Sequence, residues 1–440
     1  MMLKKIIRTL FDNTGIYIGK RPVYKGKANF KVDGFSYGFV FPSANYAPWQ
    51  GDESFMNIYN QIKGNTLVDI YRCYELWQLI KKVQSLNAQA AVLEVGVWRG
   101  GTAGIMAQQL SNLNSNATLY LADTFSGVAK AGANDSFYTG GEHSDTSQQI
   151  VEDVLKNKSK YPNYKILKGI FPEDTAHEIN AAELFGLCHI DVDVYESAKD
   201  ILEWVWQKLI PGGLVVFDDY GFSFPSANYT PWQGDIAFMN IYNKIKSNTL
   251  VDIYRCYELW QLVHKINILN PNAAILEVGV WRGGTAGIMA QQLSNLKSTA
   301  ILYLADTFSG VAKAGANDSF YTGGEHSDTS QYIVEDVLQH KSQYQHYKIL
   351  KGIFPEDTAH QISAAEQFGL CHIDVDVYDS AKDILEWVWN KLIPGGVVVF
   401  DDYGFHSCTG VTKLVEEYRN YPDRQVIHNL NGHALMIKLK

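Results

Sequence analysis

The sequence predicts an α/β protein built from two consecutive copies of one domain, each with a mostly parallel sheet that helices cover on both faces. Residues 38–220 match residues 221–403 at a constant offset of 183 with 29 differences, so each repeat is a whole domain. Within each copy, short apolar strands alternate with segments of helical period, which is typical of a parallel sheet. Residues 406–440 occur only once.

The first copy is expected to contain its elements in the order of an open α/β sheet, and the second copy repeats them 183 residues later. The glycine turn at 96–101 precedes a helix that Thr102 is expected to cap. The single tail predicts one helix, 410–420, and an antiparallel hairpin around Asn431-Gly432. The expected helices are 55–86, 102–113, 148–158 and 197–209, and the expected strands are 90–95, 118–122, 164–168, 187–192 and 214–217.

These boundaries give three parts: a basic extension at 1–37, a copy at 38–220 that lacks the closing hairpin, and a complete copy at 221–440. The extension carries eight Lys or Arg and two Asp. It is read either as a short amphipathic helix on a membrane surface or as a solvated helix that packs on its own domain. The two copies together predict an intramolecular pseudo-dimer or a homo-oligomer.

Composition narrows the class of protein. Apolar residues make up 46% of the chain, charged residues 19%, and the formal net charge is −9. This balance indicates a globular protein and disfavours a nucleic-acid partner. No apolar run reaches the roughly 18 residues that a transmembrane helix needs, and no signal peptide is evident. With five cysteines and no close pair, reduced thiols and a cytoplasmic location are expected.

The segment LEVGVWRGGTA at 93–103 joins a strand to a helix through glycines that allow close approach to a ligand. Alone it also fits a plain strand–turn–helix joint, and Trp98 and Arg99 could equally form a structural stack. Asp123 ends the next strand, where a carboxylate can bond a ribose. An anion site beside a ribose site fits S-adenosylmethionine. The candidate cofactor-binding residues are Glu94, Gly96, Trp98, Arg99, Gly100, Gly101 and Asp123, and Glu277, Gly279, Trp281, Arg282, Gly283, Gly284 and Asp306.

Carboxylates gather where the fourth and fifth strands of each copy end. Strand ends of a doubly wound sheet open onto one crevice, and clustered carboxylates repel one another unless a cation lies between them. Oxygen ligands select a hard ion such as Mg²⁺. The alternative is that some of these residues cap helices or pair with Lys or Arg, and strand alternation leaves the direction of Asp193 open. The candidate metal ligands are Asp191, Asp218 and Asp219, and Asp374, Asp401 and Asp402.

Histidines offer candidate proton acceptors. His143 and its counterpart His326 lie in the polar loop GGEHSDTS, where each is either a base near the pocket or a surface residue. His189 is expected to be a packed strand residue.

As a set, VGVWRGG, ADTFSG, IDVDVY, PGGxVVFDDY and CTGVTKLVEEY resemble the macrocin and mycinamicin O-methyltransferases and the aminocoumarin sugar O-methyltransferases. The resemblance implies a Rossmann-like S-adenosylmethionine methyltransferase domain that uses Mg²⁺. It implies metal ligands at the two aspartate trios, the first of each trio standing where the family's proposed base stands, and a ribose contact at Asp123 and Asp306. The chain departs from the family in having two such domains, and the first has no closing helix and hairpin.

These observations predict an S-adenosylmethionine- and Mg²⁺-dependent O-methyltransferase acting on a hydroxyl of a sugar or other small natural product. Asp191 or His143, and Asp374 or His326, would accept the proton. One alternative is an S-adenosylmethionine-binding scaffold in which the first copy is inactive, because its missing tail leaves a sheet edge uncovered. An NAD-dependent oxidoreductase is disfavoured by the absence of the G-x-G-x-x-G fingerprint.

Overall fold

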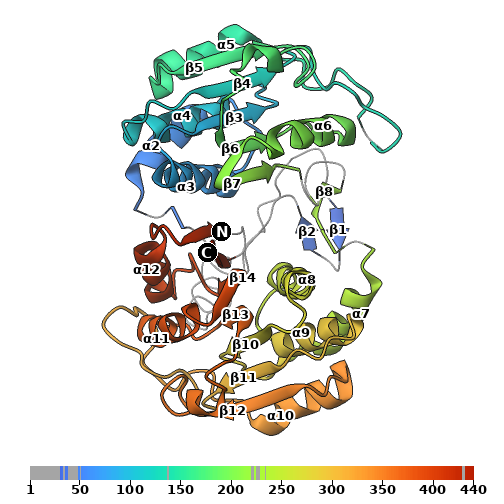
Figure 1. Cartoon of the computed structure of the whole chain (residues 1–440), viewed down its shortest axis with the longest axis vertical. Coiled ribbons are helices and arrows are strands. Elements are labelled where there is room, and N and C mark those ends of the chain that lie inside the picture. Colours follow the sequence, from blue (N-terminus) through green and yellow to red (C-terminus); the bar gives the residue numbers. More distant parts are fainter. Residues whose placement is uncertain are drawn as a thin grey trace, which may run out of the picture.

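The computed structural model describes residues 30–32, 35–37, 48–49, 51–135, 138–219, 222–223, 228–232, 234–428 and 432–440. Two α/β units lie one above the other in Figure 1, with the C-terminus between them. The 1–37 extension falls almost wholly outside the described residues, apart from the short paired strands β1 (Phe30–Val32) and β2 (Phe35–Tyr37). No helix in the described part of the chain is both long enough and apolar enough to cross a bilayer.

The first copy forms a five-stranded parallel sheet in the order β5-β4-β3-β6-β7. Helices α3 and α4 pack on one face of this sheet and α6 packs on the other. Its elements are α2 (Glu53–Ile62), α3 (Ile70–Leu86), β3 (Ala91–Val95), α4 (Gly101–Asn112), β4 (Leu119–Asp123), α5 (Gln148–Asp153), the π-helix η1 (Val154–Ser159), β5 (Tyr164–Lys168), the 3-10 helix η2 (Ala176–Glu178), β6 (Phe185–Ile190), α6 (Tyr195–Trp206) and β7 (Leu209–Phe217).

The second copy repeats this sheet and extends it to seven strands, β12-β11-β10-β13-β14-β16-β15. Strand β16 pairs antiparallel with both β14 and β15, which confirms the closing hairpin. Its elements are α7 (Ile236–Ile245), α8 (Ile253–Leu269), β10 (Ala274–Val278), α9 (Gly284–Asn295), β11 (Leu302–Asp306), α10 (Gln331–Asp336), η3 (Val337–Ser342), β12 (Tyr347–Lys351), η4 (Ala359–Gln361), β13 (Phe368–Ile373), α11 (Tyr378–Trp389), β14 (Leu392–Phe400), α12 (Thr409–Tyr418), β15 (Arg424–His428) and β16 (Ala434–Lys438). Between the copies, β8 (Phe222–Ser223) pairs with β9 (Asn228–Tyr229).

The predicted α/β class is therefore confirmed, while several local expectations are wrong. The single helix expected at 55–86 is two helices, because Asp69 caps α3 by accepting the N–H groups of Tyr71 and Arg72. The intervening turn supports α4, since the Asn65 carbonyl accepts the Gly101 N–H at 3.0 Å. Helix α4 is preceded by Gly100 in the left-handed conformation, so Thr102 is not its N-cap.

The second half of the helix expected at 148–158 widens into the π-helix η1. Within the described residues of the first copy, β7 is an edge strand, as the missing tail predicted. Trp206 at the end of α6 is 66% exposed, whereas its counterpart Trp389 is 8% exposed and donates to Asp423 of the tail. The tail thus covers the α11 face in the second copy, and α6 has no equivalent cover among the described residues.

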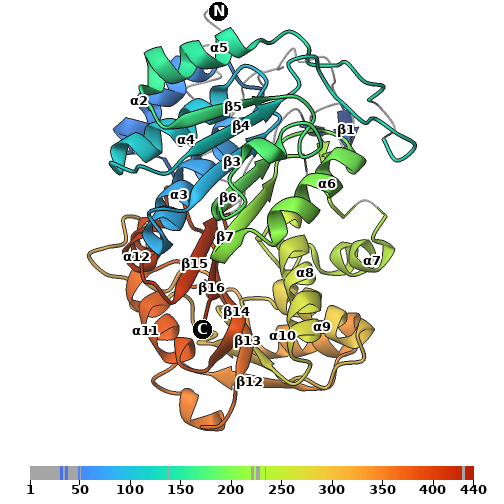
Figure 2. The ribbon, with the colours of Figure 1, turned by 45° about the horizontal axis from the view of Figure 1, so that its top comes forward.

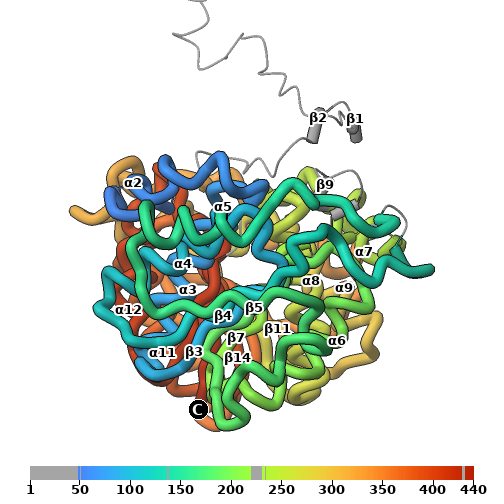
Figure 3. The backbone as a smooth tube through the Cα atoms, turned by 90° about the horizontal axis from the view of Figure 1, so that it is seen from above, coloured from blue at the N-terminus to red at the C-terminus, as the bar shows by residue number. Residues whose placement is uncertain are grey.

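The tail also touches the first copy, where it contacts helix α3. Strand β15 packs against α3 (Figure 2). Lys82 of α3 donates to the Tyr421 carbonyl at 2.9 Å, and the Tyr74 ring lies 5.6 Å from the ring of His428. Viewed from above, α12 and α7 lie on opposite sides of the molecule (Figure 3).

Candidate functional site

A cavity of about 310 Å³ opens at the carboxyl ends of the central strands of the second copy. In a doubly wound sheet this edge is where ligands bind. The cavity wall includes the turn after β10, the end of β11, the polar loop before α10 and the segment after β13. Among the predicted site residues, those that line it are Gly279, Trp281, Asp306, His326, Asp374 and Asp402.

The turn after β10 requires glycine at its first position. Gly279 has φ of +90°, and a Cβ atom there would lie 1.7 Å from the carbonyl oxygen of Asp374. No side chain fits in that space, and the left-handed backbone is strained for any L-residue. The turn therefore passes directly against the start of the acidic segment, which brings the candidate cofactor and metal residues into one cavity.

Asp306 holds this turn in place. Its Oδ2 accepts the backbone N–H groups of Val280 at 2.7 Å and Trp281 at 2.8 Å, and its Oδ1 accepts that of Phe308 at 2.6 Å. Asp123 makes the same three bonds in the first copy. Both carboxylates line their cavities, so the ribose contact stays a prediction beside this turn-holding role.

Several predicted cofactor residues lie behind the cavity wall. Glu277 is fully buried, and its Oε1 lies 2.9 Å from Nδ1 of His372; burial raises the pKa of Glu277 to about 8. Arg282 turns outward to an ion pair with Asp328, and Trp281 donates its Nε1–H to the same carboxylate. The predicted cofactor residues outside the two cavity linings are Glu94, Arg99, Gly100, Gly101, Glu277, Arg282, Gly283 and Gly284, and their cofactor role stays a prediction. The predicted metal ligand Asp401 also lies outside the lining.

The carboxylates of the second copy meet at one point. One oxygen each of Asp374, Asp401 and Asp402 lies within 4.8 Å of the others. Burial, followed by repulsion from Asp402 and Asp376, raises the pKa of Asp374 well above its usual range. Burial and the charge of Asp376 raise the pKa of Asp402 to about 7. A buried, mutually repelling oxygen cluster of this kind fits a hard divalent cation such as Mg²⁺.

An arginine that the sequence analysis missed reaches the same cluster. Arg255 of α8 forms a short ion pair with Asp401, and Arg72 forms the same pair with Asp218. Burial opposes ionisation of Asp218, but Arg72 and His189 outweigh it and lower its pKa. The alternative that some of these aspartates pair with a basic residue is thus met at Asp218 and Asp401, and each arginine partner lies 146 residues earlier in the chain.

Asp193 and Asp376 face the cavity, although strand alternation left their direction open. Both have φ of +64°, because the strand has already ended at Ile190 and Ile373. Tyr138 donates its hydroxyl hydrogen to Oδ1 of Asp193 at 2.6 Å. A non-glycine residue in this conformation is strained, and such residues concentrate at functional sites. The signal available in the sequence was the second aspartate of IDVDVY.

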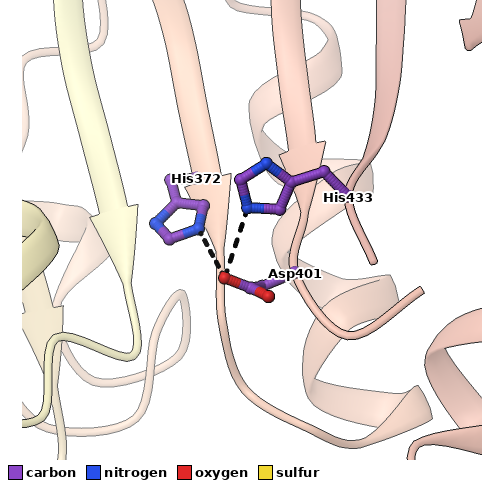
Figure 4. Close-up of side chains that lie close together, drawn as sticks. All are labelled: His372, Asp401 and His433. Carbon is purple, nitrogen blue, oxygen red and sulfur yellow. Dashed lines mark hydrogen bonds and ion pairs between the residues drawn. The ribbon is translucent and has the colours of Figure 1, made fainter. Parts of the chain in front are cut away.

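The histidines divide into two kinds. His143 and His326 line their cavities, each with a ring centroid near 6 Å from a neighbouring tyrosine, at 6.2 Å from Tyr138 and 6.1 Å from Tyr321. His189 and His372 are fully buried in the sheet, as expected for packed strand residues. His372 shares Asp401 with His433 of the tail, as Figure 4 shows.

The two cavities differ because the tail reaches only one of them. In the second copy Phe405, Ser407 and Cys408 of the tail line the cavity. In the first copy the cavity measures about 1040 Å³, and Trp232 and Met239 from the start of the second copy line it instead. Matching residues of the two copies therefore line two cavities of different size and different tail contribution.

The chain is similar to one known protein family and to individual O-methyltransferases. The model of the macrocin O-methyltransferase (TylF) family matches twice, over residues 60–230 and 245–432. A tetracenomycin-C rhamnosyl 4'-O-methyltransferase of Streptomyces olivaceus is 30% identical over 36% of this chain and 62% of its own length. Demethyldecarbamoylnovobiocin O-methyltransferase of Streptomyces niveus is 29% identical over 36% of this chain and 62% of its own.

The chain thus spans somewhat less than two thirds of the length of these relatives. Among solved structures, the O-methyltransferase NovP matches 44% of this chain and 83% of its own, at 24% identity and a TM-score of 0.39. The two family-model matches together cover most of the 440 residues and follow the duplication seen in the sequence and in the two sheets. The chain belongs to the macrocin O-methyltransferase (TylF) family, of which it carries two consecutive copies.

Proposed function

We propose that this protein is an S-adenosylmethionine-dependent O-methyltransferase that uses Mg²⁺ and acts on a hydroxyl of a sugar or other small natural product. The observation that carries the proposal is the cavity of the second copy, where the glycine turn and the carboxylates of Asp374 and Asp402 face one space. The relatives' names, which describe methylation of sugar-bearing and natural-product acceptors, support the acceptor class.

In the second copy, some residues would bind the cation and the methyl donor, and others would accept the proton. Asp374, Asp401 and Asp402 would hold the cation, which would lower the pKa of the acceptor hydroxyl. Gly279 and Trp281 would form the wall against the methyl donor, which supplies an electrophilic methyl group. Asp374 or His326 would accept the hydroxyl proton, because both face the cavity. Phe405 and Cys408 would exclude water from the acceptor side.

Methyl incorporation from radiolabelled S-adenosylmethionine into a panel of deoxysugar-bearing glycosides tests the activity. We expect incorporation by the intact chain that is lost in EDTA, restored by Mg²⁺ and lost in Asp401→Ala/Asp402→Ala. The matched control is Asp218→Ala/Asp219→Ala in the first copy. Transfer that persists in EDTA and in the second-copy variant would show the metal role to be wrong, and failure to bind S-adenosylmethionine would remove the whole proposal.

A second proposal concerns the first copy, which keeps the named glycines and carboxylates but has a wide, tail-free cavity. In this alternative it binds S-adenosylmethionine and acts as a scaffold without turnover. Calorimetry that counts bound S-adenosylhomocysteine per chain distinguishes the cases. Two sites with activity only in the second copy would support the scaffold; one site would mean that the first copy binds no cofactor.

A further inference from the structure

Two buried histidines and one aspartate converge in the second copy at a point on the sheet side of the carboxylate cluster. His372 lies on β13, Asp401 follows β14, and His433 immediately precedes β16. Nε2 of His372 and Nε2 of His433 each lie 3.3 Å from the same atom, Oδ2 of Asp401. All three residues are at most 1% exposed. Figure 4 shows both imidazole rings directed at this one oxygen.

The Nδ1 atom of each imidazole, which faces away from Asp401, contacts a glutamate. Nδ1 of His372 lies 2.9 Å from Oε1 of Glu277, and Nδ1 of His433 lies 2.6 Å from Oε2 of Glu258. When the glutamate is ionised, it accepts the Nδ1–H and so directs the lone pair of Nε2 toward Asp401. Histidines that bind metals are almost always held in this way.

The distances fit an ion better than they fit direct hydrogen bonds. An N–H···O bond is usually about 2.9 Å long, and both Nε2–Oδ2 separations are longer. Two ligand atoms bound at about 2.0–2.1 Å and at the tetrahedral angle are separated by about 3.3 Å. Arg255 and the Asp402 N–H occupy the other oxygen of Asp401, so Oδ2 is the atom presented to the two rings.

From this arrangement we infer that His372, Asp401 and His433 form a site for a borderline divalent cation of the Zn²⁺ or Co²⁺ type. Nitrogen ligands favour such ions over Mg²⁺, so this site is chemically distinct from the all-oxygen site that shares Asp401. An ion there would link β13, β14 and the tail, and would fasten the closing hairpin to the sheet.

The first copy supplies a natural control. His189 and Glu94 repeat the pair formed by His372 and Glu277, with Nδ1 and Oε1 again 2.9 Å apart. No counterpart of His433 exists there, because the tail occurs once. Nε2 of His189 lies 3.5 Å from Asp218 and is buried without a hydrogen-bond partner among the described residues. His189 does lie within 4.8 Å of Asp191 and Asp218, but this group offers one nitrogen ligand where the second copy offers two. We therefore expect the ion to be retained only in the second copy, one per chain.

The test loads the metal-stripped full chain with Zn²⁺ or Co²⁺, removes the excess by gel filtration in buffer with excess Mg²⁺ so that Mg²⁺ fills the all-oxygen sites, and measures the Zn or Co content. We expect one ion per chain in the wild type and in His189→Gln and His428→Gln, and none in His372→Gln or His433→Gln. His428 is the matched control, since it is buried in the same hairpin outside the cluster. Zn²⁺ should also raise the unfolding temperature by roughly 5 °C or more in the wild type.

A further variant keeps the test decisive if the glutamine variants fail to fold. His433→Cys retains a ligand, so Co²⁺ should bind and add a sulfur-to-cobalt charge-transfer band in the near ultraviolet that the wild type lacks. Asp402→Asn removes a ligand of the Mg²⁺ site only and should leave the Co²⁺ signal in place, which separates the two metal proposals. A wild type that retains no ion, or a His433→Gln chain that retains a full equivalent, would overturn the inference.

Discussion

The carbonyl oxygen of Asp374 occupies the space that a side chain on Gly279 would need. A Cβ on this glycine would lie 1.7 Å from that oxygen, and Gly96 meets Asp191 in the same way. The contact joins the turn of the cofactor motif to the first residue of the acidic segment. If the proposed methyl donor and cation bind at these two segments, one backbone contact in each copy sets the distance between them.

Gly279→Ala should disrupt this contact. We expect the strand ends to separate, with S-adenosylhomocysteine affinity lowered more than 100-fold and stability lowered by about 3 kcal/mol or more, because steric overlap adds to the cost of a left-handed backbone. Calorimetry and urea unfolding provide the two measurements. Gly324→Ala is the matched control, since Gly324 has the same φ of +90° with no atom within 4 Å of a Cβ. Equal effects of the two substitutions would refute the steric explanation.

Much of this architecture could be predicted from sequence because it depends on local pattern. Strand β5 begins and ends where expected, at Tyr164 and Lys168, and the expected pairing of the last two strands is present in β15 and β16, although Asn431 of the turn lies outside the described residues. The pairing of Arg255 with Asp401 could not be predicted, because it depends on how α8 packs over strand ends far along the chain. Strand alternation could not settle the direction of Asp376, because the backbone has left the strand there and takes a positive φ.

The turn-holding role of Asp306 leads to a second prediction. Asp306→Asn keeps one acceptor oxygen and introduces an NH₂ group that faces a backbone N–H donor. We expect a loss of about 1–3 kcal/mol in stability from the unsatisfied donor. We also expect at least tenfold weaker S-adenosylhomocysteine binding, because Val280 and Trp281 would no longer be fixed. Asp328→Asn is the control, since Asp328 bonds the exposed side of Trp281. If Asp306 contacted only ribose, affinity would fall with stability unchanged.

The contact between the copies should make stability depend on pH through Glu75. Burial, and then the charge of Glu258, raise the pKa of Glu75 to about 8 from an ordinary value of 4.5. A carboxyl group whose pKa is raised by folding favours the folded state less as it ionises. Its destabilising effect is therefore absent below about pH 4.5, grows as pH rises and is complete above about pH 8.

Glu75→Gln should remove this effect. The variant is expected to be more stable than the wild type at pH 9, by an amount on the order of 3 kcal/mol, and close to it at pH 5. Urea unfolding at the two pH values measures the difference. Glu53→Gln changes an exposed residue of α2 and should leave the pH dependence intact. A Glu75→Gln chain whose advantage is the same at pH 5 and pH 9 would rule out ionisation as the cause.

The tail should determine which acceptors the second copy takes. Phe405 is 4% exposed, lines the acceptor side of the cavity and lies with its ring 5.1 Å from the Arg255 guanidinium. Phe405→Ala removes this wall and makes the second cavity more like the wide first one. We expect KM for a small glycoside to rise about tenfold, because the acceptor loses contact area, while the affinity for S-adenosylhomocysteine changes less than twofold.

Phe320→Ala, which truncates a ring that is 57% exposed outside the cavity lining, is the control. Steady-state kinetics over a series of acceptors of increasing size would show whether the Phe405→Ala chain gains activity on the larger ones. Such a gain is expected because the first copy, where no tail residue closes the cavity, has room for about three times the volume. Equal losses of kcat for every acceptor would instead mean that Phe405 supports Arg255 and the carboxylates, and that acceptor size is limited elsewhere in the cavity.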